Sequence, residues 1–485
     1  MNLIEQIDHW ALAAPNAIAH ISGDRRLTYG ELRRRSDALA AYLVNRFGED
    51  RAPIAVLGHR EPEMLIAFLG AVKSGRPYVP LDTVLPQQRI DKVLAISRPA
   101  LLLTPEDVTK ISGSAAPAPA TRIQRDDSFY ILFTSGSTGE PKGVIITLGC
   151  LEHFIAWMLE EQKVIPLCET FLNTAPFSFD LSIMDLYCCL ARGGTLFSIS
   201  RDLVENPKML YRVLAGSGAT TWVSTPSFVQ MCLVEEKFAD GMLPRVRRFL
   251  FCGETLAAQT AARLFERFPR AQVWNMYGPT EATVATASVR IDQSILETHP
   301  VLPVGRAMPG TNVFVVNDAG VTLPANERGE IVIAGPNVSP GYLGRPDLTT
   351  SAFFEHCGRR AYRTGDRGRF RDDLLFFEGR VDSQLKLSGY RIELGDVEAN
   401  LLALPSVRDA VVTPLIRNGA PQSLAAFVVL RRQIEESQFE LTQSLRRQLA
   451  ERLPVYMLPR KFVFRDALPL TANGKVDRAL LAQSL

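Results

Sequence analysis

The segment of the sequence that most clearly carries chemistry is Phe129–Gly143, FYILFTSGSTGEPKG. An apolar run leads into six small residues, Thr134–Gly139, and a lysine follows at position 142. Glycines let backbone N–H groups approach an anion closely, hydroxyls add hydrogen-bond donors, and the lysine adds positive charge. The pattern therefore predicts a phosphate-binding loop, with a flexible Gly/Ser turn as the alternative. Neither a Walker A pattern nor the G-x-S-x-G pattern of a nucleophile elbow occurs in this segment.

Four further motifs follow in chain order. They are YGPTE at Tyr277–Glu281, YRTGD at Tyr362–Asp366, GRVDSQLKLSGYRIE at Gly379–Glu393 and NGK at Asn473–Lys475. Together with TSGSTGEPKG, these motifs resemble those of adenylate-forming enzymes. That superfamily contains acyl- and aryl-CoA ligases, luciferases and the amino-acid-activating adenylation domains of peptide synthetases. The resemblance covers essentially all 485 residues.

The resemblance implies ATP and Mg²⁺ as cofactors and gives roles to the matching residues. The residues that would hold the β- and γ-phosphates of ATP are Thr134, Ser135, Gly136, Ser137, Thr138, Gly139 and, as a mobile cation, Lys142. Asn275 and Tyr277 would frame the adenine, and Thr280 would hydrogen-bond the α-phosphate. Glu281 would hold Mg²⁺, a hard ion that prefers oxygen ligands.

Three more residues complete the nucleotide chemistry that the resemblance implies. Asp366 would accept both ribose hydroxyls, and Arg380 would support the same region. Lys475 would be the catalytic residue, because a cation beside the α-phosphate stabilises the negative charge that builds up when a carboxylate attacks. Taken alone, Asp366 and Arg380 would be a surface ion pair, and Lys475 a solvated lysine.

The acid to be activated is indicated by Asp180, within FSFDLSIMD. In amino-acid-activating members a carboxylate at this place pairs with the α-ammonium of the substrate, whereas an uncompensated buried carboxylate is costly. Asp180 therefore indicates an amino acid, with a helix N-cap as the alternative, and Asp185 is interpreted as structural. The resemblance to amino-acid-activating members implies further substrate-site positions, which are apolar and suit a small apolar side chain: Leu181, Met184, Cys252, Met276, Val284 and Ala285.

Within the family, several segments resemble the members that charge D-alanine onto a carrier protein for the teichoic acids of the cell wall. They are APFSFDLSIMDLY, STPSFVQMCLVEEKF, RRFLFCGETL and NMYGPTEATVA. The D configuration rests on this resemblance alone. A stand-alone enzyme for L-proline or L-alanine is the alternative. From other classes, an acyl-CoA ligase for a non-amino acid and a catalytically inactive binding protein are disfavoured by Asp180 and by the intact motifs, respectively.

The second half-reaction needs an acceptor and a change of conformation. The chain ends ten residues after Lys475, so the acceptor is expected to be the phosphopantetheine thiol of a separate small protein. After Asp382, Lys+Arg number 14 and Asp+Glu 10, and this excess of 4 suits an acidic carrier. The resemblance implies a hinge at Asp382. Rotation of the C-terminal domain about this hinge would bring the Leu387–Tyr390 face into the place of Lys475 for thioester formation. Gly389, which has no side chain, would let the pantetheine pass closely.

The elements that must position these residues alternate between strands and helices. Thr28–Glu31 has the form of a capping box before a helix. Short apolar runs predict buried parallel strands at Ile54–Gly58, Phe129–Phe133, Arg248–Cys252 and Gln272–Met276. From about Val301 short strands with Gly, Asn and Asp turns appear, such as Asn312–Val316, Glu330–Ala334 and Leu374–Glu378.

These patterns and the resemblance together predict an α/β fold. We expect two doubly wound α/β subdomains plus a small β-barrel, followed by a small mobile α+β domain. The expected domains are 1–382, which binds ATP and the amino acid, and 383–485, which carries the catalytic lysine.

Composition excludes several function classes. Lys+Arg 54 against Asp+Glu 52 gives a net charge of +2, which argues against a polyanionic partner such as nucleic acid. We expect no membrane-spanning run and no signal peptide, and therefore a cytoplasmic protein. Seven cysteines without a CxxC pair predict reduced thiols, and six scattered histidines do not predict a metal site.

Overall fold

The computed structural model describes residues 2–113, 123–136, 139–160, 167–380, 384–387, 390–417, 420–432, 437–469 and 476–485. The chain divides into two compact units, which are described separately. The larger unit contains Met1–Asp82, Ser97–Leu132 and Gly143–Val381. The smaller unit contains Thr83–Ile96, Phe133–Lys142 and Asp382–Leu485, so it includes two segments from the first third of the chain.

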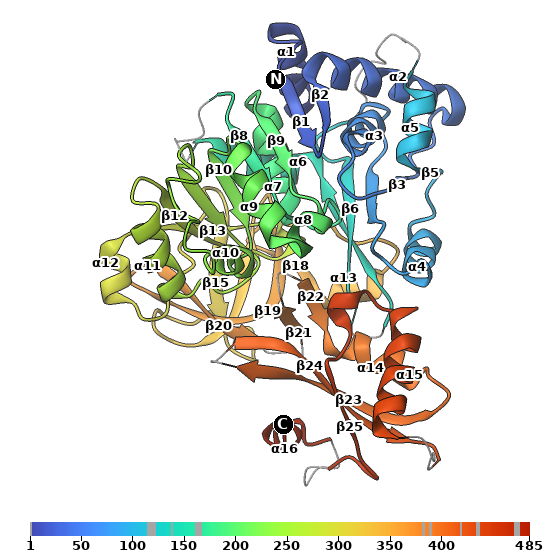
Figure 1. Cartoon of the computed structure of the whole chain (residues 1–485), viewed down its shortest axis with the longest axis vertical. Coiled ribbons are helices and arrows are strands. Elements are labelled where there is room, and N and C mark those ends of the chain that lie inside the picture. The colour runs from blue at the N-terminus through green and yellow to red at the C-terminus, as the bar shows by residue number, and fades with distance from the viewer. Residues whose placement is uncertain are drawn as a thin grey trace. The chain divides into compact units, whose positions relative to one another are not determined.

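The first sheet of the larger unit has nine strands. Their order is β14 (Arg306–Ala307), β13 (Ala287–Ile291), β12 (Gln272–Tyr277), β11 (Arg248–Phe251), β10 (Thr221–Ser224), β8 (Thr170–Asn173), β9 (Thr195–Ser198), β1 (Ile18–Ser22) and β2 (Arg25–Thr28). Figure 1 labels β1, β2, β8, β9, β10, β12 and β13 of this sheet. The six strands from β12 to β1 run parallel, and the pairs at both ends are antiparallel. The intervening helices are α7 (Leu181–Ala191), α8 (Arg201–Glu205), α9 (Pro207–Gly216), α10 (Pro226–Cys232), α11 (Ala258–Arg267), η1 (Thr280–Ala282) and α12 (Gln293–Thr298).

The second sheet has six strands. Their order is β17 (Gly341–Tyr342), β7 (Lys142–Thr147), β6 (Ser128–Thr134), β4 (Tyr78–Asp82), β3 (Ile54–Gly58) and β5 (Leu101–Leu103). The helices around it in the chain are α1 (Leu3–Ala13), α2 (Tyr29–Phe47), α3 (Pro62–Lys73), α5 (Pro105–Ile111) and α6 (Leu148–Glu160). The predicted capping box is confirmed, because the Thr28 side chain accepts from the Glu31 N–H and Glu31 bonds back to the Thr28 N–H.

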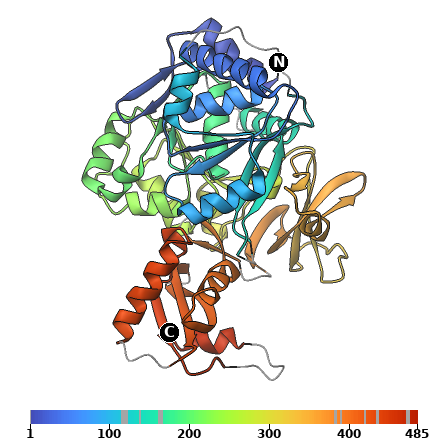
Figure 2. The ribbon, with the colours of Figure 1, turned by 90° about the vertical axis from the view of Figure 1, so that its right-hand side faces the viewer.

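The third sheet of the larger unit is antiparallel and corresponds to the small barrel that we expected. It contains β15 (Asn312–Val316), β16 (Gly329–Ala334), β19 (Arg359–Arg371), β18 (Phe353–His356) and β20 (Leu374–Arg380), and α13 (Pro346–Ala352) precedes β18. Figure 2 shows these strands, in yellow and orange, to one side of the blue and green layers of the same unit. Strands β15 (NVFVV) and β16 (GEIVIA) are rich in the β-branched residues that favour strands, and Val316, Val332 and Ala334 lie in one small buried cluster.

The smaller unit is an α+β structure. Its elements are α4 (Gln87–Ser97), β21 (Gln384–Leu387), β22 (Tyr390–Glu393), α14 (Leu394–Leu402), β23 (Val407–Arg417), β24 (Ala420–Leu430), α15 (Gln438–Ala450), η2 (Val455–Met457), β25 (Lys461–Phe464) and α16 (Arg478–Gln483). Strands β23, β24 and β25 form one sheet, and β21 pairs with β22. The predicted fold class is therefore confirmed, whereas the domain boundary at residue 382 stays a prediction.

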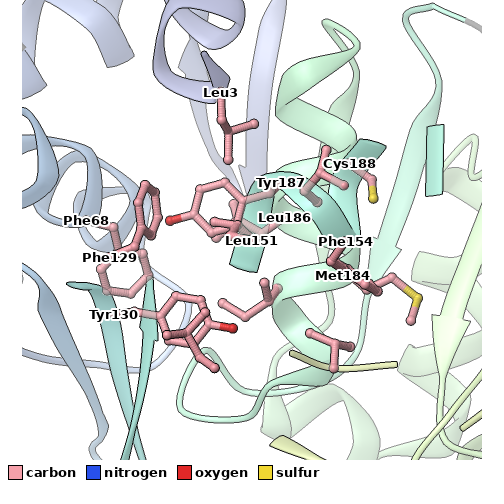
Figure 3. Packing of buried hydrophobic residues seen from close by; sticks show 14 of the residues in the cluster. Leu3, Phe68, Phe129, Tyr130, Leu151, Phe154, Met184, Leu186, Tyr187 and Cys188 are labelled. Atoms are coloured by element: carbon pink, nitrogen blue, oxygen red, sulfur yellow. The ribbon is translucent and has the colours of Figure 1, made fainter. Parts of the chain in front are cut away.

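An aromatic cluster lies where α3, β6 and α7 meet (Figure 3). The rings of Phe129 and Tyr187 meet edge to face with centroids 5.4 Å apart, and Phe68 stacks on Tyr78 at 4.2 Å. The hydroxyls of Tyr78 and Tyr187 are 2.9 Å apart, so both buried polar tips are satisfied. The cluster fixes α7, which begins just after Asp180.

No helix among the described residues has both the length and the apolar character that crossing a membrane requires.

Candidate active site

Asp180 and Thr280 are brought into contact although they lie 100 residues apart in the sequence. Asp180 occupies the N-cap position of α7, but its side chain makes no capping hydrogen bond. Instead the Thr280 hydroxyl donates to Asp180 Oδ2 at 2.6 Å. The residue expected to bind the ammonium and the residue expected to bind the α-phosphate are therefore direct neighbours.

Thr280 stands at the start of a tight turn that the sequence builds with unusual backbone conformations. Thr283 and Val284 have φ values of 57° and 68°, in the left-handed region that β-branched residues rarely adopt. Gly278 is required because a Cβ there would lie 2.6 Å from Ala285 Cα. The turn closes through a hydrogen bond from the Thr286 N–H to the Tyr277 carbonyl at 2.7 Å.

Asn337 holds this turn and was not predicted from the sequence. Its Nδ2 donates to the Ala282 carbonyl at 2.9 Å and to Thr286 Oγ1 at 3.1 Å. Its own carbonyl accepts from the Thr283 hydroxyl at 2.7 Å. Asn337 is fully buried, so these bonds fix the strained backbone beside Thr280 and Glu281. A single asparagine between short strands gives no local signal of this role.

The apolar residues expected around the substrate are all buried in the interior of the protein. All belong to one buried hydrophobic cluster: Leu181, Met184, Cys252, Met276, Val284 and Ala285. The Cys252 thiol also contacts the Val284 carbonyl at 3.7 Å, which ties the end of β11 to the left-handed turn. A thiol is a weak donor, so this contact orients Cys252 more than it stabilises the fold.

The residues expected at the adenine and ribose come from two different sheets. The Tyr277 hydroxyl, at the end of β12, donates to Asp366 Oδ2 of β19 at 2.7 Å. Arg380 of β20 forms an ion pair with Asp366 Oδ1 and donates to the Thr364 carbonyl at 3.1 Å. Burial, and then the charge of Asp366, raise the pKa of Tyr277 well above its ordinary value, so its hydroxyl stays a donor.

Asn275 carries an orphaned polar atom at the same place. Its Nδ2 donates to the Pro303 carbonyl at 2.8 Å, while its buried Oδ1 has no hydrogen-bond partner among the described residues. A buried acceptor without a partner is uncommon and costs free energy. An adenine amino group is a donor that suits this atom, which agrees with the role expected for Asn275.

Glu281 has the chemistry of a magnesium ligand. Its side chain is fully buried, and Oε1 accepts a hydrogen bond of 2.8 Å from the Tyr342 hydroxyl. Within the described part of the chain, no group of three or more His, Cys, Asp or Glu could form a metal site. Mg²⁺ commonly takes one or two carboxylates and completes its shell with phosphate oxygens and water, so a single buried carboxylate suits this ion. Tyr342 was not predicted.

The described part of the phosphate loop belongs to the smaller unit. The Ser135 hydroxyl donates to the Arg391 carbonyl at 2.8 Å and accepts from the Glu393 N–H at 3.1 Å, so it is engaged by β22. Thr134 Oγ1 is buried and has no hydrogen-bond partner among the described residues. Two positions require glycine: Gly139 has a φ of 82°, and a Cβ on Gly136 would lie 2.1 Å from the Glu140 carbonyl oxygen.

Several predicted residues remain without a structural description. Lys142 begins β7, whereas Ser137, Thr138, Asp382, Gly389 and Lys475 lie outside the described residues. The roles given to all site residues therefore stay predictions, and the geometry above concerns only the described ones.

A buried polar chain anchors the segment that carries Asp180. His20 Nε2 lies 2.9 Å from Ser198 Oγ, Ser198 donates to Asn173 Oδ1 at 2.9 Å, and Asn173 Nδ2 donates to Asp185 Oδ2 at 3.0 Å. Asn173 also donates to the Ala175 carbonyl at 3.0 Å. Burial raises the pKa of Asp185 well above its ordinary value. Asp185 is fully buried and bonded to Asn173, which agrees with its interpretation as a structural residue, while Asn173, Ser198 and His20 were not predicted.

Two family models match the chain. The model described as AMP-binding enzyme matches residues 7–343, and the one described as AMP-binding enzyme C-terminal domain matches residues 396–475. The chain belongs to the AMP-binding enzyme family. The interpretation of the five ordered motifs as those of an adenylate-forming enzyme is therefore confirmed.

One curated member of this family and two solved structures illustrate the similarity. D-alanine--D-alanyl carrier protein ligase of Bacillus cereus strain Q1 is 43% identical over 499 residues, which covers 99% of each chain. The Vibrio cholerae adenylation domain AlmE, in complex with glycyl-adenosine-5'-phosphate, has a TM-score of 0.84 at 23% identity over 99% of this chain and 97% of its own. Holo-PA1221, an NRPS protein containing adenylation and PCP domains, has a TM-score of 0.83 at 25% identity over 100% of this chain and 84% of its own.

Proposed function

We propose that this enzyme activates D-alanine with ATP and transfers it to the phosphopantetheine thiol of a separate carrier protein. The observation that carries the proposal is the placement of the Asp180 carboxylate against Thr280. Leu181, Cys252 and Val284, which are expected to line the substrate site, belong to one buried hydrophobic cluster. The full-length similarity to a D-alanine--D-alanyl carrier protein ligase supports D-alanine as the amino acid.

In the first half-reaction a carboxylate oxygen of D-alanine attacks the α-phosphorus of ATP. A bond forms between that oxygen and phosphorus, the α–β phosphoanhydride bond breaks, and pyrophosphate leaves with the bonding electron pair. Asp180 holds the α-ammonium, and Thr280 donates to the α-phosphate. Lys475 stabilises the negative charge that grows on the phosphorus oxygens. Asp366, with its charge balanced by Arg380, accepts the ribose hydroxyls.

Mg²⁺ would be held by Glu281 together with phosphate oxygens and water. When bound, it neutralises phosphate charge and lowers the cost of bringing a carboxylate to a polyanion. Tyr342 orients the Glu281 carboxylate through its hydroxyl, because a ligand held by a neighbouring donor keeps its position.

In the second half-reaction the pantetheine thiol, as a thiolate, attacks the alanyl carbonyl. A thioester forms, AMP leaves, and the thiol proton passes to solvent. The Bacillus cereus relative is named as a ligase for a D-alanyl carrier protein, which supports a carrier protein as the acceptor, and holo-PA1221 combines adenylation and PCP domains in one protein. We propose an acidic carrier, domains 1–382 and 383–485, and a hinge at Asp382 for the change between the two steps.

Loading of a carrier tests the whole reaction. Purified enzyme is incubated with ATP, Mg²⁺, D-alanine and a phosphopantetheinylated carrier protein from a bacterium that modifies teichoic acids, and the carrier mass is measured. A mass increase equal to one alanyl group that hydroxylamine removes is the expected result. The matched control is the same carrier without phosphopantetheine. No loading with D-alanine, together with loading by L-alanine or L-proline, would assign the enzyme to another amino acid.

A further inference from the structure

The single hydroxyl proton of Thr280 has two possible hydrogen-bond acceptors. In the structure it is donated to Asp180 at 2.6 Å. In the proposed reaction the same hydroxyl donates to the α-phosphate of ATP. A threonine hydroxyl has one proton, and carboxylate and phosphate oxygens are both acceptors. Thr280 can therefore serve either Asp180 or ATP as a donor at one time.

Which acceptor receives the Thr280 hydrogen bond depends on whether an ammonium group is bound at Asp180. With no amine present, the carboxylate is a strong acceptor for the Thr280 hydroxyl. An α-ammonium at Asp180 brings its own donors and compensates the carboxylate charge. The hydrogen bond from the Thr280 hydroxyl to Asp180 therefore weakens. The hydroxyl can then turn about its Cβ–Oγ bond toward the α-phosphate.

We propose that Thr280 couples the two substrates, because the amine of the amino acid releases its hydroxyl proton for ATP. This inference rests on the proposed function. Each substrate then increases the affinity for the other, and the two increases are equal because the coupling is reciprocal. An acid without an amine binds without this benefit, so the device also favours amino acids over other carboxylic acids.

The backbone on both sides of the contact is fixed, which confines the change to the hydroxyl. Thr280 is followed by the left-handed turn that buried Asn337 holds through Ala282, Thr283 and Thr286. Asp180 is followed at once by α7, which is anchored through Asp185 and Asn173. A rotation of one hydroxyl requires no movement of either element.

The coupling is measured with compounds that cannot react. The nucleotide is α,β-methylene-ATP with Mg²⁺, whose α–β link cannot release pyrophosphate. D-Alaninol supplies the ammonium without a carboxylate, and propionate supplies the carboxylate without an ammonium. The dissociation constant of the nucleotide is determined by calorimetry for each combination. D-Alaninol should lower it by about fivefold or more, and propionate should leave it unchanged.

Two substitutions at Thr280 separate the proton from the shape of the side chain. Thr280→Val keeps the shape and removes the proton, and it should abolish the effect of D-alaninol on the nucleotide. Thr280→Ser keeps the proton and should retain the effect, which also controls for damage to the turn. Full coupling in Thr280→Val would overturn the proposal, as would equal nucleotide affinity with and without D-alaninol in the unaltered enzyme.

A double-mutant cycle separates the effect of the Thr280 proton on nucleotide affinity from the effect of the Asp180 charge. Asp180→Asn weakens the acceptor, so it should raise nucleotide affinity in the absence of amine. Part of that gain comes from removing a negative charge near a polyanion, and this part persists in the Thr280→Val background. The gain should therefore be larger when Thr280 is present, and equal gains in both backgrounds would contradict the proposal.

Pyrophosphate exchange with D-alanine on the same preparations distinguishes a failure of the coupling through Thr280 from a failure of the proposed function. Exchange without coupling would overturn the role of Thr280 and leave the proposed function standing. Absence of exchange would overturn the proposed function itself.

Discussion

The Tyr277 hydroxyl donates a 2.7 Å hydrogen bond to Asp366, although the two residues come from different sheets. Tyr277 is the last residue of β12, and Asp366 lies within β19. Asp366 is only 1% exposed, so Tyr277 and Arg380 provide its side chain with the partners that water cannot. This pair ties the nine-stranded sheet to the antiparallel sheet where the ribose is expected to bind.

Tyr277→Phe should therefore weaken both the fold and nucleotide binding. The change leaves a buried carboxylate short of one donor, a loss of about 1.5–3 kcal/mol. We expect a lower thermal midpoint and an ATP KM raised by about tenfold, with the D-alanine KM nearly unchanged. Tyr211→Phe is the matched control, because its hydroxyl bonds to the Cys232 carbonyl at 3.2 Å, at the end of α10. Equal behaviour of the two variants would contradict the role of Tyr277.

Asp185 should act on amino-acid binding through Asn173. Asp185→Leu removes the acceptor of the Asn173 amide and loosens the segment that leads to Asp180, so the D-alanine KM should rise by about tenfold with the ATP KM unchanged. Asp185→Asn keeps an acceptor oxygen and loses only a charge that burial already disfavours, so it should behave nearly as the unaltered enzyme. Steady-state kinetics that show no difference between the two variants would remove Asp185 from this role.

His20 should make the fold sensitive to mild acid. Burial, and then nearby arginines, lower the pKa of His20 to about 3 from 6.5. At pH values between these two pKa values, the unfolded chain therefore binds more protons than the folded protein. The free energy of unfolding falls as the pH drops below about 6.5. The loss from pH 6.5 to 5.5 should be about 1 kcal/mol for this group. Thermal midpoints of the unaltered enzyme should fall more steeply over this range than those of His20→Gln; parallel curves would refute the assignment.

Lys475 should be needed for one half-reaction only. Lys475→Ala should abolish formation of alanyl adenylate, because the positive charge expected beside the α-phosphorus is then lost. Transfer to the carrier from adenylate supplied in the assay should persist. Quenched-flow measurement of both steps decides this, and an equal loss of both would contradict the proposed division of labour.

Much of the fold was predictable because its signals are local. The capping box at Thr28, the buried strand at Ile54–Gly58 and the short strands from Asn312 onward depend on a few adjacent residues, and the structure contains each of them. The grouping of residues 83–96 and 133–142 with the C-terminal part was not expected. It includes the ion pair of Arg89 with Asp396 at 3.1 Å, which joins residues 307 positions apart.

The site was predictable only where a motif names its residues. Asp180, Thr280 and Asp366 stand in recognisable patterns, whereas Asn337, Asn173 and Tyr342 are polar residues whose partners lie in distant segments. Sequence spacing cannot show which buried donor meets which acceptor. The contact of Thr280 with Asp180 could not be foreseen for the same reason, although both residues were assigned separately.

ATP–pyrophosphate exchange with D-alanine, L-alanine, glycine, L-serine, L-proline and propionate side by side is the most direct measurement of the central claim. It reports reversible formation of the adenylate and needs no carrier. Exchange should be fastest with D-alanine and absent with propionate. Exchange that propionate supports and that every amino acid fails to support would contradict it.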